Sequence, residues 1–135
     1  MLVRAYQPAD RRELERLAHA MFPDAADPFG HDVTWLVVDR GDGRLAGYIE
    51  LGARAYAEGC DSSPVAYIEA WYVDEDARQS GWGRELVAAA EAWARGAGFT
   101  ELASGALLDN ERSIAAHKAL GFREVERQVH FAKKL

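Results

Sequence analysis

The most constraining feature of this sequence is a glycine turn between an apolar run and an amphipathic run. Residues 65–73 are apolar, aromatic or β-branched, which predicts a β-strand. From residue 84 to residue 95 apolar side chains recur at helical spacing, which predicts a helix that Gly96 helps to end. Gly81 and Gly83 lie between the two, so the chain leaves a strand, turns tightly and enters a helix. Such a turn presents unpaired N–H groups and the positive end of a helix dipole, with room for a phosphate group.

Several phosphate-binding loops share this design, and the residues beside the turn distinguish them. A dinucleotide-binding fingerprint needs a third glycine, but Gly83 is followed by Arg84-Glu85-Leu86. A P-loop needs Lys-Ser or Lys-Thr after its last glycine, and that pair does not follow here. The acidic run Asp74-Glu75-Asp76 before the turn is more typical of a solvated loop than of a cation site. We therefore expect a phosphate site of another class, and no metal site.

The rest of the sequence predicts one mixed sheet with helices packed on it, in an α/β chain of the α+β type. Residues 34–39 and 45–56 are expected to form a hairpin around Gly41-Asp42-Gly43. Asp10 and Glu13 are spaced for a capping box at the start of a helix that Pro23 ends. Further elements are expected as strands over 3–6, 100–104 and 125–132, the last as one strand or two, and as a helix from Asn110 to Gly121. A chain of 135 residues without repeats suits a single domain over residues 1–135.

Charge and composition limit the partners of the chain. A net charge of −6 argues against nucleic acid and favours a cationic small molecule, although such a charge also serves solubility alone. No apolar run reaches the roughly 20 residues that span a bilayer, and residues 1–6 lack the apolar region of a signal peptide. The single cysteine, Cys60, excludes an internal disulfide and fits a reducing compartment, while its loop setting argues against a nucleophile. We expect a cytoplasmic protein with no membrane partner and no nucleic-acid partner.

The turn itself resembles a known family. Its pattern Arg78-x-x-Gly81-x-Gly83 is similar to the acetyl-CoA pyrophosphate motif of the GCN5-related N-acetyltransferase (GNAT) superfamily. The helix that Asn110 begins, leading into Leu120-Gly121-Phe122, and the order of elements fit the same superfamily. A closer likeness to the aminoglycoside 6'-N-acetyltransferases covers roughly residues 50–135. It rests on five matches in order, at residues 63–73, 100–104, 108–110, 117–122 and 130–134.

This resemblance implies a GNAT fold with acetyl-CoA in a cleft between the central strands. The acetyl group would go to a primary amine, which by closest likeness is the 6'-amine of an aminoglycoside. The alternative acceptor is another small amine, a polyamine or a peptide. A further alternative is that the chain is a non-catalytic acyl-CoA-binding module. The family likeness also implies a homodimer, paired through the last strands around residues 129–131. The cofactor-binding residues that it implies are Trp71, Val73, Arg78, Gln79, Ser80, Gly81, Trp82, Gly83, Arg84, Asn110 and His117.

Backbone groups would do most of the binding that the resemblance implies. The N–H groups of Gln79 and of residues 81–84 would hold the pyrophosphate of the cofactor. The backbone of Trp71 and Val73 would bind the pantetheine arm as an added strand does. The N–H of Val73 would stabilise the carbonyl oxygen as it gains negative charge. Asn110 would hydrogen-bond the cofactor arm, with a plain helix-capping role as the alternative.

Amine deprotonation requires a base, because an unperturbed alkylamine titrates near pH 10 and only about one in a thousand is neutral at pH 7. Glu69 is the predicted base. Strict alternation along the strand would place Tyr67, Glu69, Trp71 and Val73 on one face, with Glu69 close to the oxyanion donor. The alternative for Glu69 is an exposed charge or an ion pair with Arg54.

Proton donation to the leaving thiolate is assigned to His117 by the same resemblance, since imidazole suits proton transfer near neutral pH. A role in packing alone is the alternative. The chain departs from the subgroup at Gly105, where an Asp commonly follows Ala-Ser and is a candidate for contact with the substrate amine or for the base. Glu69, Asp109 or a water ordered by the substrate could compensate. The alternative for Asp109 is to cap the next helix. The expected acceptor-binding residues are Phe22, Glu50, Tyr56, Glu69 and Asp109, with Asp24, Asp27, Asp32 and Trp35 as neighbours.

Overall fold

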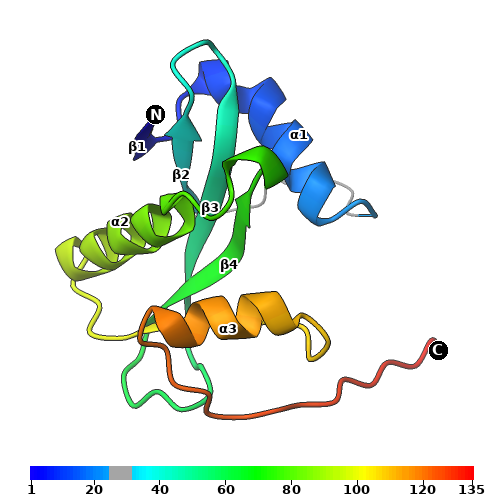
Figure 1. The fold of residues 1–135 in the computed structure, drawn as a ribbon. Coiled ribbons are helices and arrows are strands. Elements are labelled where there is room, and N and C mark those ends of the chain that lie inside the picture. The colour runs from blue at the N-terminus through cyan, green and yellow to red at the C-terminus, as the bar shows by residue number, and fades with distance from the viewer. Residues whose placement is uncertain (25–31) are drawn as a thin grey trace.

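The computed structural model describes residues 1–24 and 32–135, which form one sheet with helices on both faces (Figure 1). In chain order the elements are β1 (Leu2–Ala5), the 3₁₀-helix η1 (Pro8–Asp10), α1 (Arg11–Met21), β2 (Thr34–Asp39), β3 (Leu45–Arg54), β4 (Val65–Val73), the 3₁₀-helix η2 (Glu75–Ala77), α2 (Trp82–Gly96), β5 (Leu102–Ser104) and α3 (Glu111–Ala119). The strands lie in the order β1-β2-β3-β4-β5. The first three neighbouring pairs are antiparallel and the pair β4–β5 is parallel. The expected mixed, mostly antiparallel sheet is confirmed.

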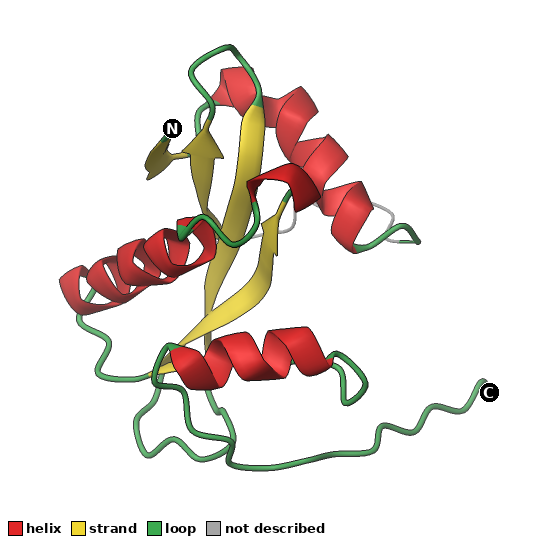
Figure 2. Cartoon of the chain, viewed as in Figure 1, coloured by secondary structure: helices red, strands yellow, loops and turns green. Residues whose placement is uncertain are grey.

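Two helices cover opposite faces of this sheet and create two cores (Figure 2). On one face the apolar side of α1 packs against β2, β3 and β4, in a core made of Leu14, Leu17, Ala18, Val37, Leu45, Tyr48 and Ala70. On the other face α2 packs against the same strands, in a core that includes Val38, Ile49, Leu51, Ile68, Leu86, Val87 and Ala90. Both helices have the amphipathic spacing that the sequence shows, so burial of one apolar stripe explains each of them. We refer below to the α1 side and the α2 side of the sheet.

A β-bulge in β4 interrupts the alternation of side chains. Opposite β3, Ile68 pairs with Leu51 and Ala70 pairs with Glu50, so Glu69 is an extra residue with no opposite residue in the described β3. Ile68 packs in the core on the α2 side, whereas Ala70 packs in the core on the α1 side. Two residues that strict alternation would place on one face therefore lie on opposite faces.

The bulge overturns one expectation from the sequence. Trp71 and Val73 pack against the core on the α2 side. Tyr67 and Glu69 flank Ile68, which points to the α2 side, so they face the α1 side. The expectation that these four side chains share one face is wrong, because the inserted residue shifts the two-residue period of the strand.

The start of α1 also differs from the sequence expectation. Asp10 occupies the N-cap position, but within the described chain its side chain makes no capping bond. Its carboxylate instead lies 2.7 Å from Arg4. Glu13 accepts hydrogen bonds from Arg16 and from the backbone N–H of Leu45. The predicted capping box of α1 is therefore wrong. Arg4 and the Gln7 N–H donate to the Asp10 carboxylate, and Arg16 and the Leu45 N–H donate to that of Glu13.

The C-terminal part of the chain lacks its expected strand. Residues 120–135, all of which the structure describes, contain no strand, and Figure 2 shows them as an extended coil. A strand requires a hydrogen-bonded neighbour, and residues 125–132 pair with no strand of the described parts of the chain. The strand expected to end at Tyr56 ends at Arg54. Asp27, an expected acceptor neighbour, lies outside the described residues. Of the helices in the described parts of the chain, none is both long and apolar enough to span a membrane.

Candidate active site

The glycine turn has the backbone geometry of an anion cradle. After η2 the chain passes through left-handed backbone at Gln79 (φ 60°) and Gly81 (φ 88°) before α2 begins at Trp82. The first α2 bond runs from the Glu85 N–H to the Gly81 carbonyl at 3.0 Å. The N–H groups of residues 82–84 therefore begin the helix without partners inside it, as at any helix start. A Cβ built on Gly81 would meet no described atom within 4 Å, so this side of the turn is open. Open N–H groups at the positive end of a helix dipole suit a phosphate.

The other predicted turn residues serve the shape of the turn. The Arg78 side chain folds back, and its Nε donates to the carbonyl oxygen of Val73 at 2.8 Å. Trp82 packs against the core on the α2 side and so anchors the first turn of α2. Ser80 is exposed and its hydroxyl lies 3.4 Å from the Arg78 carbonyl oxygen. Arg84 is exposed on the first turn of α2, where a cation is close enough to assist an anion.

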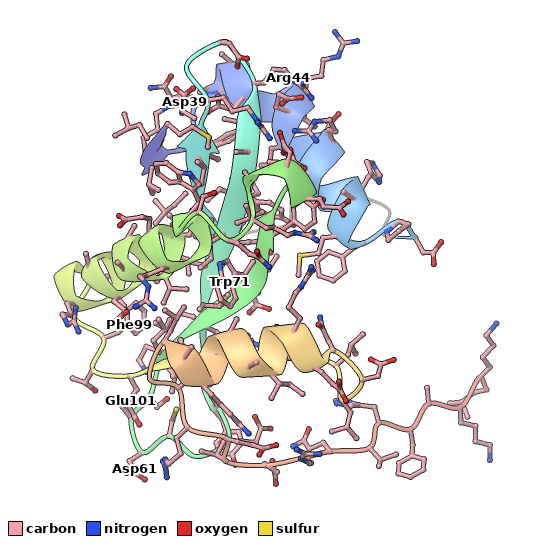
Figure 3. All side chains as sticks on the ribbon, viewed as in Figure 1. Asp39, Arg44, Asp61, Trp71, Phe99 and Glu101 are labelled. Atoms are coloured by element: carbon pink, nitrogen blue, oxygen red, sulfur yellow. The ribbon has the colours of Figure 1, made fainter. Side chains whose placement is uncertain are left out.

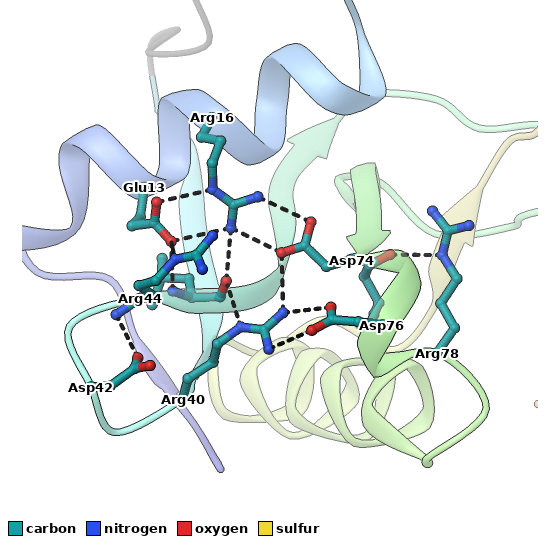
Figure 4. A network of polar contacts seen from close by, with 10 residues as sticks. Glu13, Arg16, Arg40, Asp42, Arg44, Asp74, Asp76 and Arg78 are labelled. Atoms are coloured by element: carbon teal, nitrogen blue, oxygen red, sulfur yellow. Dashed lines mark hydrogen bonds and ion pairs between the residues drawn. The ribbon is translucent and has the colours of Figure 1, made fainter.

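An ionic network fixes the segment that joins β4 to the turn (Figure 4). Asp74, directly after β4, accepts from Arg16 at 2.9 Å and from Arg40 at 3.3 Å. Arg40 also pairs with Asp76 at 2.7 Å. Glu13 closes the network through Arg16 at 2.9 Å. Asp74 is thus largely buried and held by arginines from α1 and from the segment after β2, whereas Glu75 and Asp76 are exposed to solvent as expected.

One edge of β4 is open next to the turn. In the described chain β5 pairs with β4 only through Ala66, Tyr67 and Ile68, so the last part of β4 extends beyond β5. The bond from Arg78 to the Val73 carbonyl lies on that edge, because the next residue, Asp74, donates its N–H to β3. In an extended strand the N–H and C=O of one residue point the same way. The N–H of Val73 therefore points to the open edge, as an added-strand site for an extended ligand requires.

Trp71 connects the turn to α3 (Figure 3). Its buried Nε1–H has no hydrogen-bond partner among the described residues. A Cβ built on Gly83 would lie 3.3 Å from the Trp71 ring, so the missing side chain at position 83 makes space for the indole. The ring of His117 stands edge-on to the indole, with centroids 5.1 Å apart. A buried donor without a partner is costly, which makes this edge a place where a polar ligand group gains a hydrogen bond.

His117 is held at both ring nitrogens. Its Nδ1 lies 2.7 Å from the Ser113 carbonyl oxygen, which can only accept, so Nδ1 carries a proton. Its Nε2 lies 2.8 Å from the Ser104 hydroxyl. In the neutral ring Nε2 accepts from that hydroxyl. The ring also packs edge-on to Phe122, with centroids 5.3 Å apart. The predicted packing role of His117 therefore has a structural basis, and Ser104 is a partner that the sequence pattern did not single out.

The α1-side face of the bulge carries the predicted base. Glu69 accepts two hydrogen bonds from Arg54, at 3.0 Å from Nε and 2.7 Å from Nη2. The Arg54 guanidinium in turn lies 3.6 Å above the centre of the Tyr67 ring. The ion pair that was the alternative to a catalytic role is therefore present. In this bidentate geometry the positively charged guanidinium lies directly against both oxygens of the Glu69 carboxylate.

Glu50 is a second carboxylate on the same face. It lies on β3 opposite Ala70, beside the bulge, and its Oε1 accepts from the indole Nε1 of Trp35 at 2.8 Å. Burial raises the pKa of the Glu50 carboxyl above its ordinary value. The Trp35 hydrogen bond opposes that rise in pKa, while the negative charge of Glu69 adds to it. Trp35 itself packs against the core on the α1 side, so the indole is a fixed donor.

The remaining expected acceptor residues lie on separate segments. Phe22 follows α1 and is 43% exposed, and Tyr56 follows β3 and is 69% exposed. Asp109 is exposed in the loop before α3. Asn110 caps that helix, since its side chain accepts from the Ser113 N–H at 3.2 Å. The capping alternative therefore holds for Asn110 and is wrong for Asp109, which lies one residue too early.

A cavity of about 690 Å³ lies between β5, α3 and the C-terminal coil. Tyr67, Ser104, Gly105 and His117 contribute to its wall, and Gln128 closes it from the coil. A Cβ built on Gly105 would lie 3.1 Å from the Tyr67 hydroxyl. The cavity therefore meets β4 at Tyr67, within the part of the strand that pairs with β5. Gly105, where the resemblance implies an Asp, faces the Tyr67 hydroxyl.

Comparison with known proteins agrees with this geometry. The Acetyltransferase (GNAT) family matches residues 2–122. An aminoglycoside N(6')-acetyltransferase type 1 of Stenotrophomonas maltophilia is 38% identical over 143 residues, which cover 98% of this chain and 93% of the relative. The apo structure of aminoglycoside 6'-N-acetyltransferase AAC(6')-IG from Acinetobacter haemolyticus has a TM-score of 0.88 at 30% identity and covers 100% of this chain and 99% of that chain.

A further solved structure carries a ligand. AAC(6')-Iy, in complex with the bisubstrate analogue CoA-S-monomethyl-acetylneamine, has a TM-score of 0.89 at 28% identity. The match covers 99% of this chain and 98% of that chain, so the open edge and the glycine turn both lie within it. This chain therefore belongs to the acetyltransferase (GNAT) family, and its relatives within that family are aminoglycoside 6'-N-acetyltransferases.

Proposed function

We propose that this chain transfers the acetyl group of acetyl-CoA to the 6'-amine of an aminoglycoside. The observation that carries the proposal is that β4 joins an open anion cradle at one end to two carboxylates beside its bulge. The first suits a pyrophosphate and the second suits a cationic amine. The names of relatives that match nearly the whole chain support the acceptor, and the CoA analogue bound by AAC(6')-Iy supports the donor.

The donor side fits acetyl-CoA at three points of the structure. The turn offers N–H groups around Gly81 for the pyrophosphate, the edge of β4 offers the backbone of Trp71 and Val73, and the Trp71 indole offers a buried donor. Asn110 and His117 line the approach from α3 in this proposal. When bound, acetyl-CoA supplies a thioester whose acyl carbon an amine attacks. The N–H of Val73 then stabilises the charge that develops on the carbonyl oxygen.

The acceptor side consists of the α1-side face and the cavity beside it. Glu50 provides negative charge for an ammonium group, with Glu69 and its partner Arg54 beside it. Phe22 and Tyr56 provide exposed aromatic surface for a sugar ring. Asp109 adds a further carboxylate from the loop before α3. A net charge of −6 assists the approach of a polycation.

The test is release of free thiol from acetyl-CoA in the presence of different amines. Kanamycin and its 6'-hydroxyl analogue form the matched pair, with spermidine and a lysine peptide as other amine classes. We expect turnover with kanamycin and none above background with the 6'-hydroxyl analogue. Turnover with spermidine or the peptide but not with kanamycin would support acetyltransferase activity and reject the aminoglycoside as the acceptor. Tight CoA binding without turnover on any amine would favour a non-catalytic acyl-CoA-binding module.

A cytoplasmic homodimer is part of the same proposal. The free thiol of Cys60 fits a reducing compartment. In the C-terminal coil Val129 is 76% exposed and Phe131 is 92% exposed, which is unfavourable unless a second copy covers them. Light scattering coupled to size exclusion tests this point: we expect a dimer that Phe131→Asp converts to monomer, and a monomeric parent protein would reject it.

A further inference from the structure

The two carboxylates beside the bulge differ in what already balances their charge. The two oxygens of Glu69 each accept a hydrogen bond from Arg54, and the Glu69 side chain is 27% exposed. A guanidinium bound at both oxygens satisfies a carboxylate in charge and in geometry. A substrate ammonium would compete with that guanidinium for the same two oxygens. Glu69 is therefore poorly placed to accept a proton while Arg54 remains.

Glu50 has a polar partner but no countercharge. Within residues 1–24 and 32–135 no salt bridge reaches it, and its hydrogen bond comes from the neutral indole of Trp35. That bond orients Oε1 and leaves the charge of the carboxylate uncompensated. Burial and the nearby charge of Glu69 both raise the pKa of Glu50. A half-buried anion without a cation gains most from a cationic ligand.

Glu50 faces the same side of the sheet as the bulge. Along β3, Tyr48 packs on the α1 side while Ile49 and Leu51 pack on the α2 side, so Glu50 faces the α1 side. It pairs with Ala70, directly after the bulge, and is three residues along β3 from Gly47, which pairs with Val73. Glu50 thus lies on the α1-side face of the strand next to β4.

We propose that Glu50 binds the ammonium group of the acceptor and removes its proton, while Glu69 is a positioning residue that holds Arg54. In this step an N–H bond of the ammonium breaks and an O–H bond forms at Oε2 of Glu50, the oxygen other than the one that accepts from Trp35. The nitrogen keeps the electron pair, so a neutral amine and a neutral carboxylic acid result. This inference rests on the proposed function for the identity of the acceptor, but the assignment of Glu50 applies to any primary amine.

The kinetic test compares three isosteric variants, Glu50→Gln, Glu69→Gln and, as a surface control, Glu15→Gln. The amide of Glu50→Gln can still accept from Trp35, so folding should be retained. We expect this variant to lower kcat/KM for the amine by about 100-fold or more. Glu69→Gln should lose less than about tenfold, mainly through KM, because it only loosens Arg54. Affinity for CoA, measured by calorimetry, should stay within about twofold in all three because none contacts the turn.

A second readout does not depend on turnover. The carboxyl carbon of Glu50 is followed by NMR in the complex with CoA, with kanamycin or spermidine added. We expect the amine to lower the apparent pKa of Glu50, since a nearby cation favours the charged form. An unchanged pKa of Glu50 with kanamycin and a lowered pKa with spermidine would reject the aminoglycoside as acceptor and support Glu50 as the amine-binding residue. No shift with either amine, or turnover of Glu50→Gln within about threefold of the parent, would overturn the assignment.

Discussion

Gly83 has two separate reasons to lack a side chain. It lies in the first turn of α2, where the proposed function brings a phosphate close to the backbone, and its Cα faces the Trp71 ring. The distance of 3.3 Å between a built Cβ and that ring means that even a methyl group presses on the indole. A bulky substitution such as Gly83→Val therefore disturbs packing and ligand approach together, so it cannot separate them. The smallest change, Gly83→Ala, is the informative one.

We predict that Gly83→Ala weakens CoA binding by about tenfold while the protein stays folded, because the shifted indole narrows the open edge of β4. Gly96→Ala is the matched control, at the far end of the same helix, where a Cβ meets nothing within 4 Å. That control should raise the free energy of unfolding by about 0.4–1 kcal/mol and leave CoA affinity unchanged. Calorimetry with CoA and urea unfolding measure the two effects. Equal CoA affinity in Gly83→Ala and the parent would show that the turn does not hold the ligand.

At the scale of elements, the ionic network ties the end of β4 and η2 to α1 and to the segment after β2. Asp74 forms ion pairs with Arg16 of α1 and with Arg40 in the segment after β2, and its side chain is only 13% exposed. Arg16 also donates to the backbone carbonyl of Leu45 at 2.9 Å, which ties α1 to the start of β3. The ionic network thus holds the segment before the glycine turn, and the packing of Trp82 holds the segment after it. Such pre-organisation lowers the conformational entropy that ligand binding must remove.

Asp74→Asn is expected to lower the free energy of unfolding by about 1–3 kcal/mol, because two arginines lose a charged acceptor that is largely buried. We also expect weaker CoA binding, since the turn loses its support. Glu91→Gln breaks an exposed pair with Arg95 and serves as the control, with an effect below about 0.5 kcal/mol. Urea unfolding curves of the parent protein, Asp74→Asn and Glu91→Gln measure the free energies of unfolding to be compared. A change in Asp74→Asn no larger than in the control would mean that the network is only a surface feature.

For the molecule as a whole, the N-terminal strand is held by charge as well as by the sheet. Arg4 on β1 donates to Asp10, which precedes α1, and to Asp39 at the end of β2. The Arg4 hydrogen bond is the main reason why the pKa of the Asp10 carboxyl lies below its ordinary value. The Arg16 hydrogen bond lowers the pKa of Glu13 in the same way. Stability of the whole fold therefore depends on pH in the acidic range.

The sign of that dependence follows from proton binding. In the unfolded chain these carboxyls titrate near their ordinary pKa values of about 4, so there the unfolded state binds more protons than the folded state. Their contribution to the free energy of unfolding is complete above about pH 5 and is lost as pH falls through the folded pKa values. We predict a steady loss of stability below about pH 5 in urea unfolding, and a shallower loss in Asp10→Asn. An identical slope in the variant would contradict the role of Asp10.

Short-range patterns in the sequence predicted most of the elements. The strands over Thr34–Asp39 and Val65–Val73 have the expected bounds, and the glycine turn leads into a helix as expected. These features depend on alternation, helical spacing and the φ preference of glycine, all of which act between near neighbours. The expected strand over 125–132 fails because a strand needs a neighbour that local sequence does not supply.

The arrangement of the site required the tertiary structure. The sequence by itself determined which residues have the chemistry: the glycines of the turn, the carboxylates and His117. Only the fold decided that a bulge separates Glu69 from Trp71, that Arg54 neutralises Glu69, and that Trp35 holds Glu50. Register between strands is set by packing summed over both faces of the sheet, and one inserted residue reverses every side chain after it. A contact between residues far apart in the chain is therefore settled by the folded whole, which no local pattern encodes.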